Sequence, residues 1–178
     1  MSEKSMTPQK QGKVDGAESK KADVLEEKSV EELQEYLEEF RTKLLDDGVL
    51  DEQFTQLQQL QDDSNQDFVK EVVDLFFEDS TKLLDQLSKE VKTEPIDYKQ
   101  VDAHVHQFKG SSSSVGAHRV TEVCKSFRLC CDKEDAPGCK ASLEKVKQEF
   151  ALFKAKLGEL LDIESKIIEK GGTLPMPE

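Results

Sequence analysis

Apolar residues recur at helical spacing along most of this chain. From Val30 onward they return every three or four positions and are separated by polar turns. Positions three and four apart share one face of an α-helix, so the pattern predicts a succession of amphipathic helices. In the first three helices the stripes expected to be buried are Val30, Leu33, Leu37, Phe40 and Leu44; Phe54, Leu57 and Leu60; and Phe68, Val72, Leu75, Phe76, Leu83, Leu87 and Val91.

Capping and breaking residues indicate where these helices begin and end. Asp51 can cap the short second helix, and Pro95 stops the long third one. Asp97 with Gln100 three residues later has the pattern of a capping box for a fourth helix. That helix runs to about residue 115, where Gly116 offers a C-terminal cap.

Two further helices are expected after Gly116, on either side of a turn at Asp135–Gly138. Their stripes are Val120, Val123, Cys124, Phe127, Cys130 and Cys131, and then Leu143, Val146, Phe150, Phe153, Leu157, Leu160 and Ile167. No alternating run bounded by hairpin turns predicts a strand, so the fold class is all-α. We expect the last four helices to form an antiparallel four-helix bundle, with the two N-terminal helices packed against one end.

The first 28 residues have a different composition. They are mostly Lys, Glu, Ser, Gln and Gly with few apolar side chains, which is too little to offset the entropy of ordering them. The sequence therefore predicts a disordered tail over residues 1–28 and one folded domain over residues 29–178.

Charge and hydropathy narrow the class of partner. The 178 residues carry a formal net charge of -13, which disfavours nucleic acid and an anionic membrane surface. The sequence has neither a membrane-spanning apolar run of roughly 18 residues nor a signal core at its N-terminus. We expect a soluble intracellular protein, monomeric, whose partners are other proteins.

The fourth predicted helix carries the candidate chemistry. At about 100° per residue, its apolar positions and Ser112 fall within about 40° of one line, which is the core face. His106 lies about 140° from that line and is therefore expected on the solvent side, whereas His104 lies about 60° away at the boundary. Lys109, Gly110 and Ser113 follow at three, four and seven residues from His106, where side chains share its face of the helix.

Gly110 is unexpected in a helix, because glycine costs about 0.5–1 kcal/mol relative to alanine there. A glycine beside an exposed imidazole lets a second macromolecule approach the ring. Lys109 supplies a positive charge, and a neutral imidazole is a competent phosphoryl nucleophile. Between Val101 and Lys133 five Lys or Arg stand against three Asp or Glu, so this region is locally basic in an acidic chain. Ser112 is expected to point inward and to bond a carbonyl one turn back.

These residues resemble the phosphotransfer motif of plant histidine-containing phosphotransfer proteins. The similarity extends from about Leu50 to Glu178. Its centre is the run His106-Gln107-Phe108-Lys109-Gly110-Ser111-Ser112, followed by Ser114 and Gly116. The first 28 residues fall outside it, and the sequence gives no purpose for this extension.

The resemblance implies a phosphoryl carrier that is not itself an enzyme. In that family the histidine at the place of His106 takes a phosphoryl group from the receiver domain of a hybrid sensor histidine kinase and gives it to a response-regulator receiver, typically in cytokinin signalling. Lys109, Gly110, Ser113 and Gln107 are then expected to contact phosphate or partner, in the cytoplasm and nucleus. The carrier binds no cofactor, and Mg²⁺ belongs to the partner receiver domain.

Three alternative functions compete with that of a phosphoryl carrier. A zinc site would need His104, His106, His118 and the cysteines to converge. The chain has no Cys-x-x-Cys, three of the cysteines fall on the apolar stripe of the fifth helix, and His104 and His106 point to different sides of the fourth. No phosphate loop or nucleotide fingerprint supports a self-contained kinase. A helical decoy that docks on receiver domains without being phosphorylated stays open, although such a protein is expected to have lost the histidine.

Overall fold

The computed structural model describes residues 15–177 of the chain. These residues form seven helices and no strand, apart from one isolated bridge between Asp62 and Asn65. The predicted all-α class is therefore confirmed. The helices are α1 (Asp15–Glu26), α2 (Val30–Asp46), α3 (Glu52–Gln59), α4 (Phe68–Lys92), α5 (Tyr98–Ser114), α6 (His118–Asp132) and α7 (Ala136–Glu169).

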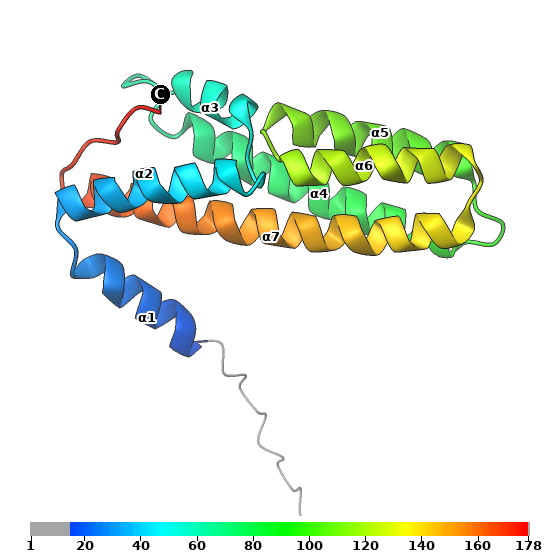
Figure 1. The fold of residues 1–178 in the computed structure, drawn as a ribbon, viewed down its shortest axis with the longest axis horizontal. Coiled ribbons are helices and arrows are strands. Elements are labelled where there is room, and N and C mark those ends of the chain that lie inside the picture. Colours follow the sequence, from blue (N-terminus) through cyan, green and yellow to red (C-terminus); the bar gives the residue numbers. More distant parts are fainter. Residues whose placement is uncertain (1–14, 178) are drawn as a thin grey trace, which may run out of the picture.

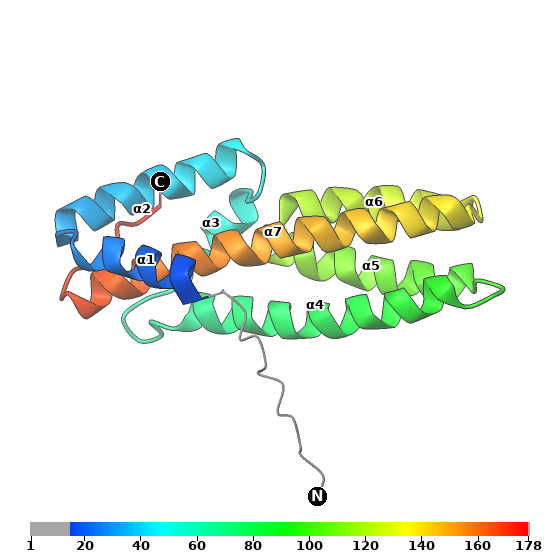
Figure 2. The ribbon, with the colours of Figure 1, turned by 90° about the horizontal axis from the view of Figure 1, so that it is seen from below.

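Helices α4 to α7 form an antiparallel four-helix bundle, as the sequence predicts (Figures 1 and 2). Short connections between successive helices favour antiparallel neighbours. The 34 residues of α7 span about 51 Å at 1.5 Å per residue. This helix continues well past the ends of α5 and α6, and α2 lies along its second half (Figure 1).

Aromatic side chains fix the inward face of α5 against its neighbours. The ring of Phe108, which is fully buried, packs edge to face with Phe76 of α4 and Phe150 of α7, at centroid distances of 6.4 and 6.2 Å. Phe76 also packs edge to face with Phe153, at 5.6 Å. Such contacts add to the burial of apolar area. Because α5 is held by this face, its opposite face is presented to solvent.

Gly116 joins α5 to α6 in a conformation that requires glycine. Its φ of +74° lies in the left-handed region that favours glycine, and a Cβ there would come within 2.5 Å of the backbone nitrogen of Phe54. The Asp51 N–H donates to the Gly116 carbonyl at 3.1 Å. The predicted cap of α5 therefore also fastens the start of α3 to the end of the bundle.

The C-terminal segment returns over α2 after α7 ends. Gln34 donates to the Thr173 carbonyl and Arg41 to the Pro175 carbonyl, both at 2.7 Å. Arg41 also forms an ion pair with Glu164 of α7, with 3.0 Å between Nη2 and Oε1. Both side chains of this pair are buried, so it links α2, α7 and the C-terminal segment in the interior.

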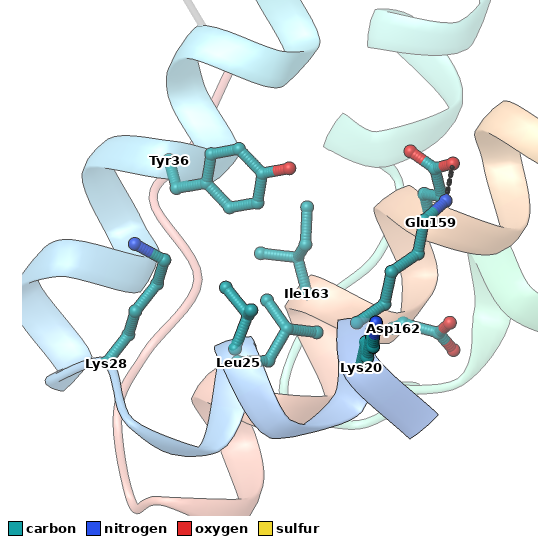
Figure 3. A pocket seen from close by; sticks show the side chains of 9 residues that line it. Lys20, Leu25, Lys28, Tyr36, Glu159, Asp162 and Ile163 are labelled. Atoms are coloured by element: carbon teal, nitrogen blue, oxygen red, sulfur yellow. Dashed lines mark hydrogen bonds and ion pairs between the residues drawn. The ribbon is translucent and has the colours of Figure 1, made fainter. Parts of the chain in front are cut away.

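The structure differs from the predicted disordered tail between Asp15 and Lys28. Residues Asp15–Glu26 form α1, whose sequence is rich in helix-favouring Ala, Glu and Lys. Leu25 is half-buried against the core and faces Ile163 and Tyr36 across a groove between α1, α2 and α7 (Figure 3). Lys21 pairs with Glu159 at 2.7 Å. The prediction for residues 1–14 lies outside the described residues.

Two leucines assigned to buried stripes are exposed instead. Leu75 is 58% exposed and Leu60 is 67% exposed. The buried face of α4 includes a polar residue, Ser80, so the apolar pattern alone placed this face incorrectly. Its buried positions are Val69, Val73, Phe76, Ser80, Leu84, Leu87, Glu90 and Val91.

The boundary between α6 and α7 also differs from the predicted turn at Asp135–Gly138. Asp135 is the N-cap of α7, and its side chain accepts a hydrogen bond from the Gly138 N–H. Pro137 lies within the first helical turn, where its missing N–H costs no hydrogen bond. Among the helices described, none is long and apolar enough to cross a membrane.

Candidate functional site

His106 lies on the exposed face of α5, opposite the residues that anchor this helix in the bundle. Val101, Val105 and Phe108 are buried with no exposed surface, whereas His106 is exposed. The side chain thus stands on the side that the helical projection gives. An imidazole in this position is accessible to another protein.

Arg128 of α6 reaches across to the His106 ring. Its Nη1 lies 2.9 Å from Nδ1 of His106. The same guanidinium contacts Asp102, with 3.0 Å from Nε to Oδ1 and 3.4 Å from Nη2 to Oδ2. Asp102 lies one helical turn before His106 on α5. The three side chains therefore form a connected polar chain across the α5 and α6 surfaces.

Arg128 stays positively charged in this arrangement. The hydrogen bond from Arg128 to Asp102 raises the pKa of the guanidinium above its ordinary value. A guanidinium has only N–H donors, so Nδ1 of His106 must be the acceptor in their contact. The site accordingly holds a permanent cation against the imidazole.

Arg128 and Asp102 were not among the site residues predicted from the sequence. Asp102 precedes His106 by four residues, which places both on one side of α5, and this spacing was an available signal. Arg128 lies on another helix, and the apolar pattern of α6 does not reveal which of its polar residues meets α5. Only the packing of the two helices brings Arg128 to the ring.

The predicted neighbours of His106 occupy the same side of α5. Gln107 and Ser113 are exposed, and Lys109 is half-buried. The pKa of the Glu122 carboxyl on α6 is lowered mainly by a hydrogen bond from Lys125, and the charge of Lys109 adds to this effect. Lys109 is therefore close enough to α6 to influence its charges, and it adds a second cation to the region.

Gly110 leaves open space one turn after His106. No heavy atom outside its own helical backbone lies within 4 Å of the position that a Cβ would occupy. Its carbonyl accepts a hydrogen bond from the Ser114 hydroxyl at 2.9 Å. Neither close packing nor an unusual backbone angle requires glycine here.

Ser112 lies on the opposite, buried face. Its hydroxyl is 2.7 Å from the Phe108 carbonyl, one turn back, and 3.1 Å from that of Lys109. Thr121 of α6 donates to the Ser112 oxygen at 3.1 Å. Ser112 therefore helps to join α5 and α6, and with Gly116 it supports the helix that carries His106.

His104 projects to a different flank and has its own partner. Its Nδ1 lies 2.8 Å from the carboxylate of Glu90, which is buried on α4. The sequence placed His104 at the boundary of the core but did not identify Glu90. This contact ties α5 to α4 and does not involve His106.

The cysteines pack in the interior. Cys124, Cys131 and Cys139 are buried and Cys130 is half-buried. Burial raises the pKa of the Cys124 thiol to about 12, which keeps it protonated. Within the described residues, no group of three or more His, Cys, Asp or Glu side chains is arranged to hold a metal ion.

Comparisons with known proteins agree with this geometry. The Hpt domain model matches residues 71–161, which include His106, Asp102 and Arg128. Histidine-containing phosphotransfer protein 1 of Arabidopsis thaliana is 47% identical over 145 residues, which cover 82% of this chain and 94% of that protein. Pseudo histidine-containing phosphotransfer protein 6 of the same plant is 40% identical, with 83% and 97% covered.

Solved structures show the same fold. A histidine-containing phosphotransfer protein from Medicago truncatula superposes with a TM-score of 0.75 at 43% identity, covering 79% of this chain and 96% of the other. A maize histidine-containing phosphotransfer protein gives 0.72 at 39% identity, covering 76% and 99%. The chain therefore belongs to the histidine-containing phosphotransfer family, whose members carry phosphoryl groups in two-component signalling.

Proposed function

We propose that this chain is a phosphorelay carrier whose phosphoacceptor is His106. It accepts a phosphoryl group from the receiver domain of a hybrid sensor histidine kinase and passes it to the receiver of a response regulator. The observation that carries the proposal is the exposed imidazole of His106, held beside the cation of Arg128 at the centre of the family motif. A developing negative charge on the phosphoryl oxygens is stabilised by such a cation.

The transfer itself needs little from this chain. A ring nitrogen of His106 attacks the phosphorus of the receiver's phosphoaspartate, a nitrogen–phosphorus bond forms, and the bond to the aspartate oxygen breaks with its electron pair. We assign the catalytic groups, including Mg²⁺, to the receiver domain. The carrier supplies the accessible nucleophile and a docking surface formed by Gln107, Lys109, Gly110 and Ser113.

The cellular setting follows the same proposal. We propose that the chain works in cytokinin signalling, as a monomer that moves between cytoplasm and nucleus. Its net charge of -13 suits neither nucleic acid nor an anionic membrane as a partner. Receiver domains are therefore the partners that we assign.

A second function is a decoy that binds receiver domains without being phosphorylated. Some relatives of this chain are named pseudo histidine-containing phosphotransfer proteins, including one from rice that is 46% identical over 116 residues. A decoy has no use for an accessible nucleophile. The presence of His106 on the exposed face of α5 favours the carrier.

Transfer from a phosphorylated receiver domain separates the two functions. Mass spectrometry of acid-labile, base-stable phosphate should place the modification on His106, and His106→Gln should abolish it with little change in melting temperature. His104→Gln is the matched control, because glutamine can still donate to Glu90. Saturable binding of receiver domains without any phosphorylation would instead identify a decoy, and modification of His104 would move the site.

A further inference from the structure

We propose that Arg128 is a positioning residue that donates to Nδ1 of His106 in the resting and the phosphorylated ring, leaves Nε2 as the nitrogen open to phosphorylation, and prolongs the lifetime of the phosphohistidine. This inference rests on the proposed function of His106 as phosphoacceptor. It assigns to Arg128 a role in the chemistry of the carrier beyond the ion pair with Asp102.

The geometry defines the resting state of the ring. Nη1 of Arg128 donates to Nδ1 across 2.9 Å, and a neutral imidazole that accepts at Nδ1 carries its proton on Nε2. Within the described residues, Nε2 has no hydrogen-bond partner. One ring nitrogen is thus covered by a fixed cation, and the other is open to a partner.

Asp102 holds the guanidinium in place for this contact. It accepts from Nε and Nη2 of Arg128, which leaves Nη1 to bond the ring. A second carboxylate, that of Asp132 on α6, also helps to raise the pKa of the guanidinium. A planar guanidinium that is fixed by two hydrogen bonds holds the direction of its remaining N–H group better than the ammonium group of a lysine would.

The hydrogen bond from Arg128 to Nδ1 can form when the His106 ring is phosphorylated, but not while the ring attacks the phosphorus. For attack, Nε2 must present a lone pair, so the ring proton moves to Nδ1 and Arg128 must release that nitrogen. After the nitrogen–phosphorus bond forms and the aspartate oxygen leaves, the ring is cationic and gives its Nδ1 proton to water. Nδ1 then again has a lone pair, and Arg128 can donate to it as in the resting state.

This arrangement opposes loss of the phosphoryl group to water. In hydrolysis a water oxygen bonds to phosphorus, the nitrogen–phosphorus bond breaks, and the electron pair stays on Nε2. The leaving ring is a neutral imidazole if Nδ1 is protonated and an imidazolate if it is not, and the neutral ring leaves far more readily. Arg128 occupies the Nδ1 lone pair and places a positive charge beside it, so protonation is disfavoured on both grounds.

The test compares the full chain with Arg128→Met, which removes the donors and retains an unbranched side chain. Arg119→Met is the matched control, because Arg119 lies on the same helix and forms a comparable ion pair, 2.8 Å from Glu149. The proteins are phosphorylated with phosphoramidate, which needs no docking surface. Nitrogen-15 and phosphorus-31 NMR then report the tautomer, the phosphorylated nitrogen and the rate of hydrolysis.

In the wild type and Arg119→Met we expect the proton of the free ring on Nε2 and phosphate on Nε2. Arg128→Met should give a mixture of tautomers, some Nδ1-phosphohistidine, and hydrolysis about three- to tenfold faster, the effect of one modest hydrogen bond. Asp102→Asn should fall between them. Unchanged tautomers and lifetimes in Arg128→Met would overturn the inference. If no protein were phosphorylated, the proposed function would fail, and the tautomer of the free ring would still decide the role of Arg128.

Discussion

Gly110 lies one helical turn after His106 on the exposed face of α5, and the space above it is empty. No heavy atom outside the local helix backbone lies within 4 Å of a Cβ built at Gly110, and its φ is not positive. The fold therefore does not require glycine at this position. The presence of glycine here is better explained by the binding of a partner, such as a receiver domain that must come close to the His106 ring.

Replacement of Gly110 should accordingly separate stability from docking. Gly110→Leu should fold normally but accept phosphate from a receiver domain at least about tenfold more slowly, because reacting atoms must approach to about 3–3.5 Å. Transfer from phosphoramidate should be unaffected, since a small donor needs no flat surface. Time courses with the two donors measure the difference.

Gly110→Ala provides the control for this experiment. Helix propensity alone should stabilise it by about 0.5–1 kcal/mol in urea denaturation, with little effect on transfer. Equal loss of transfer from both donors in Gly110→Leu, or its unfolding, would show that Gly110 serves packing and that docking occurs elsewhere.

The sequence predicted most of the helices because their cores follow a regular period. It also placed Gly116 at the C-terminal cap of α5, because a cap depends on local residues. Leu75 was misplaced because the buried face of α4 contains the polar Ser80, which an apolar pattern excludes. Local signals suffice where the interactions are local.

The parts that could not be predicted depend on how helices far apart in sequence meet. His106 could be assigned to the solvent side from its own helix alone. The contact with Arg128 depends on the rotation of α6 against α5, which no periodicity fixes. Likewise, α1 is polar enough to look disordered, and Leu25 packs beside Tyr36 of α2 and Ile163 of α7, which its own helix does not reveal.

Removal of residues 1–28 should leave transfer intact and cost little stability. α1 contributes partial burial of Leu25 and surface ion pairs such as Lys21 with Glu159, each worth about 0–1 kcal/mol. We expect a loss of about 1–2 kcal/mol in urea denaturation, with an unchanged rate of phosphoryl transfer. A cooperative loss of the whole bundle would show that α1 is an integral part of the core.

The cysteines should differ in reactivity according to burial. Burial raises the pKa of Cys124 to about 12 and also raises that of Cys131, so neither forms much thiolate at pH 8. Iodoacetamide should therefore modify the half-buried Cys130 first in the native protein, as followed by peptide mass spectrometry. In urea all four cysteines should react together, and rapid native labelling of Cys124 would contradict the packing described.

The buried ion pair of Arg41 and Glu164 should give the fold a defined pH dependence. Burial raises the pKa of Glu164 above its ordinary value of 4.5, although Arg41 and Gln58 act in the opposite direction. The folded protein then binds a proton on Glu164 more readily than the unfolded chain does. The contribution of this proton to the free energy of unfolding is fully present below about pH 4.5, and it is lost as the pH rises through the raised pKa of Glu164 in the folded protein.

Glu164→Gln tests this sign, because glutamine keeps the shape of the side chain but does not titrate. The substitution removes the negative charge that faces Arg41, which changes the free energy of unfolding by a nearly constant amount. The titration of Glu164 in the wild type adds a contribution that depends on pH. We expect the free energy of unfolding of the wild type, measured in urea relative to Glu164→Gln, to fall as the pH rises above 4.5. A wild type that gained stability relative to the variant over this range would mean that attraction to Arg41 outweighs the burial of the carboxylate. Parallel curves would mean that the two effects cancel.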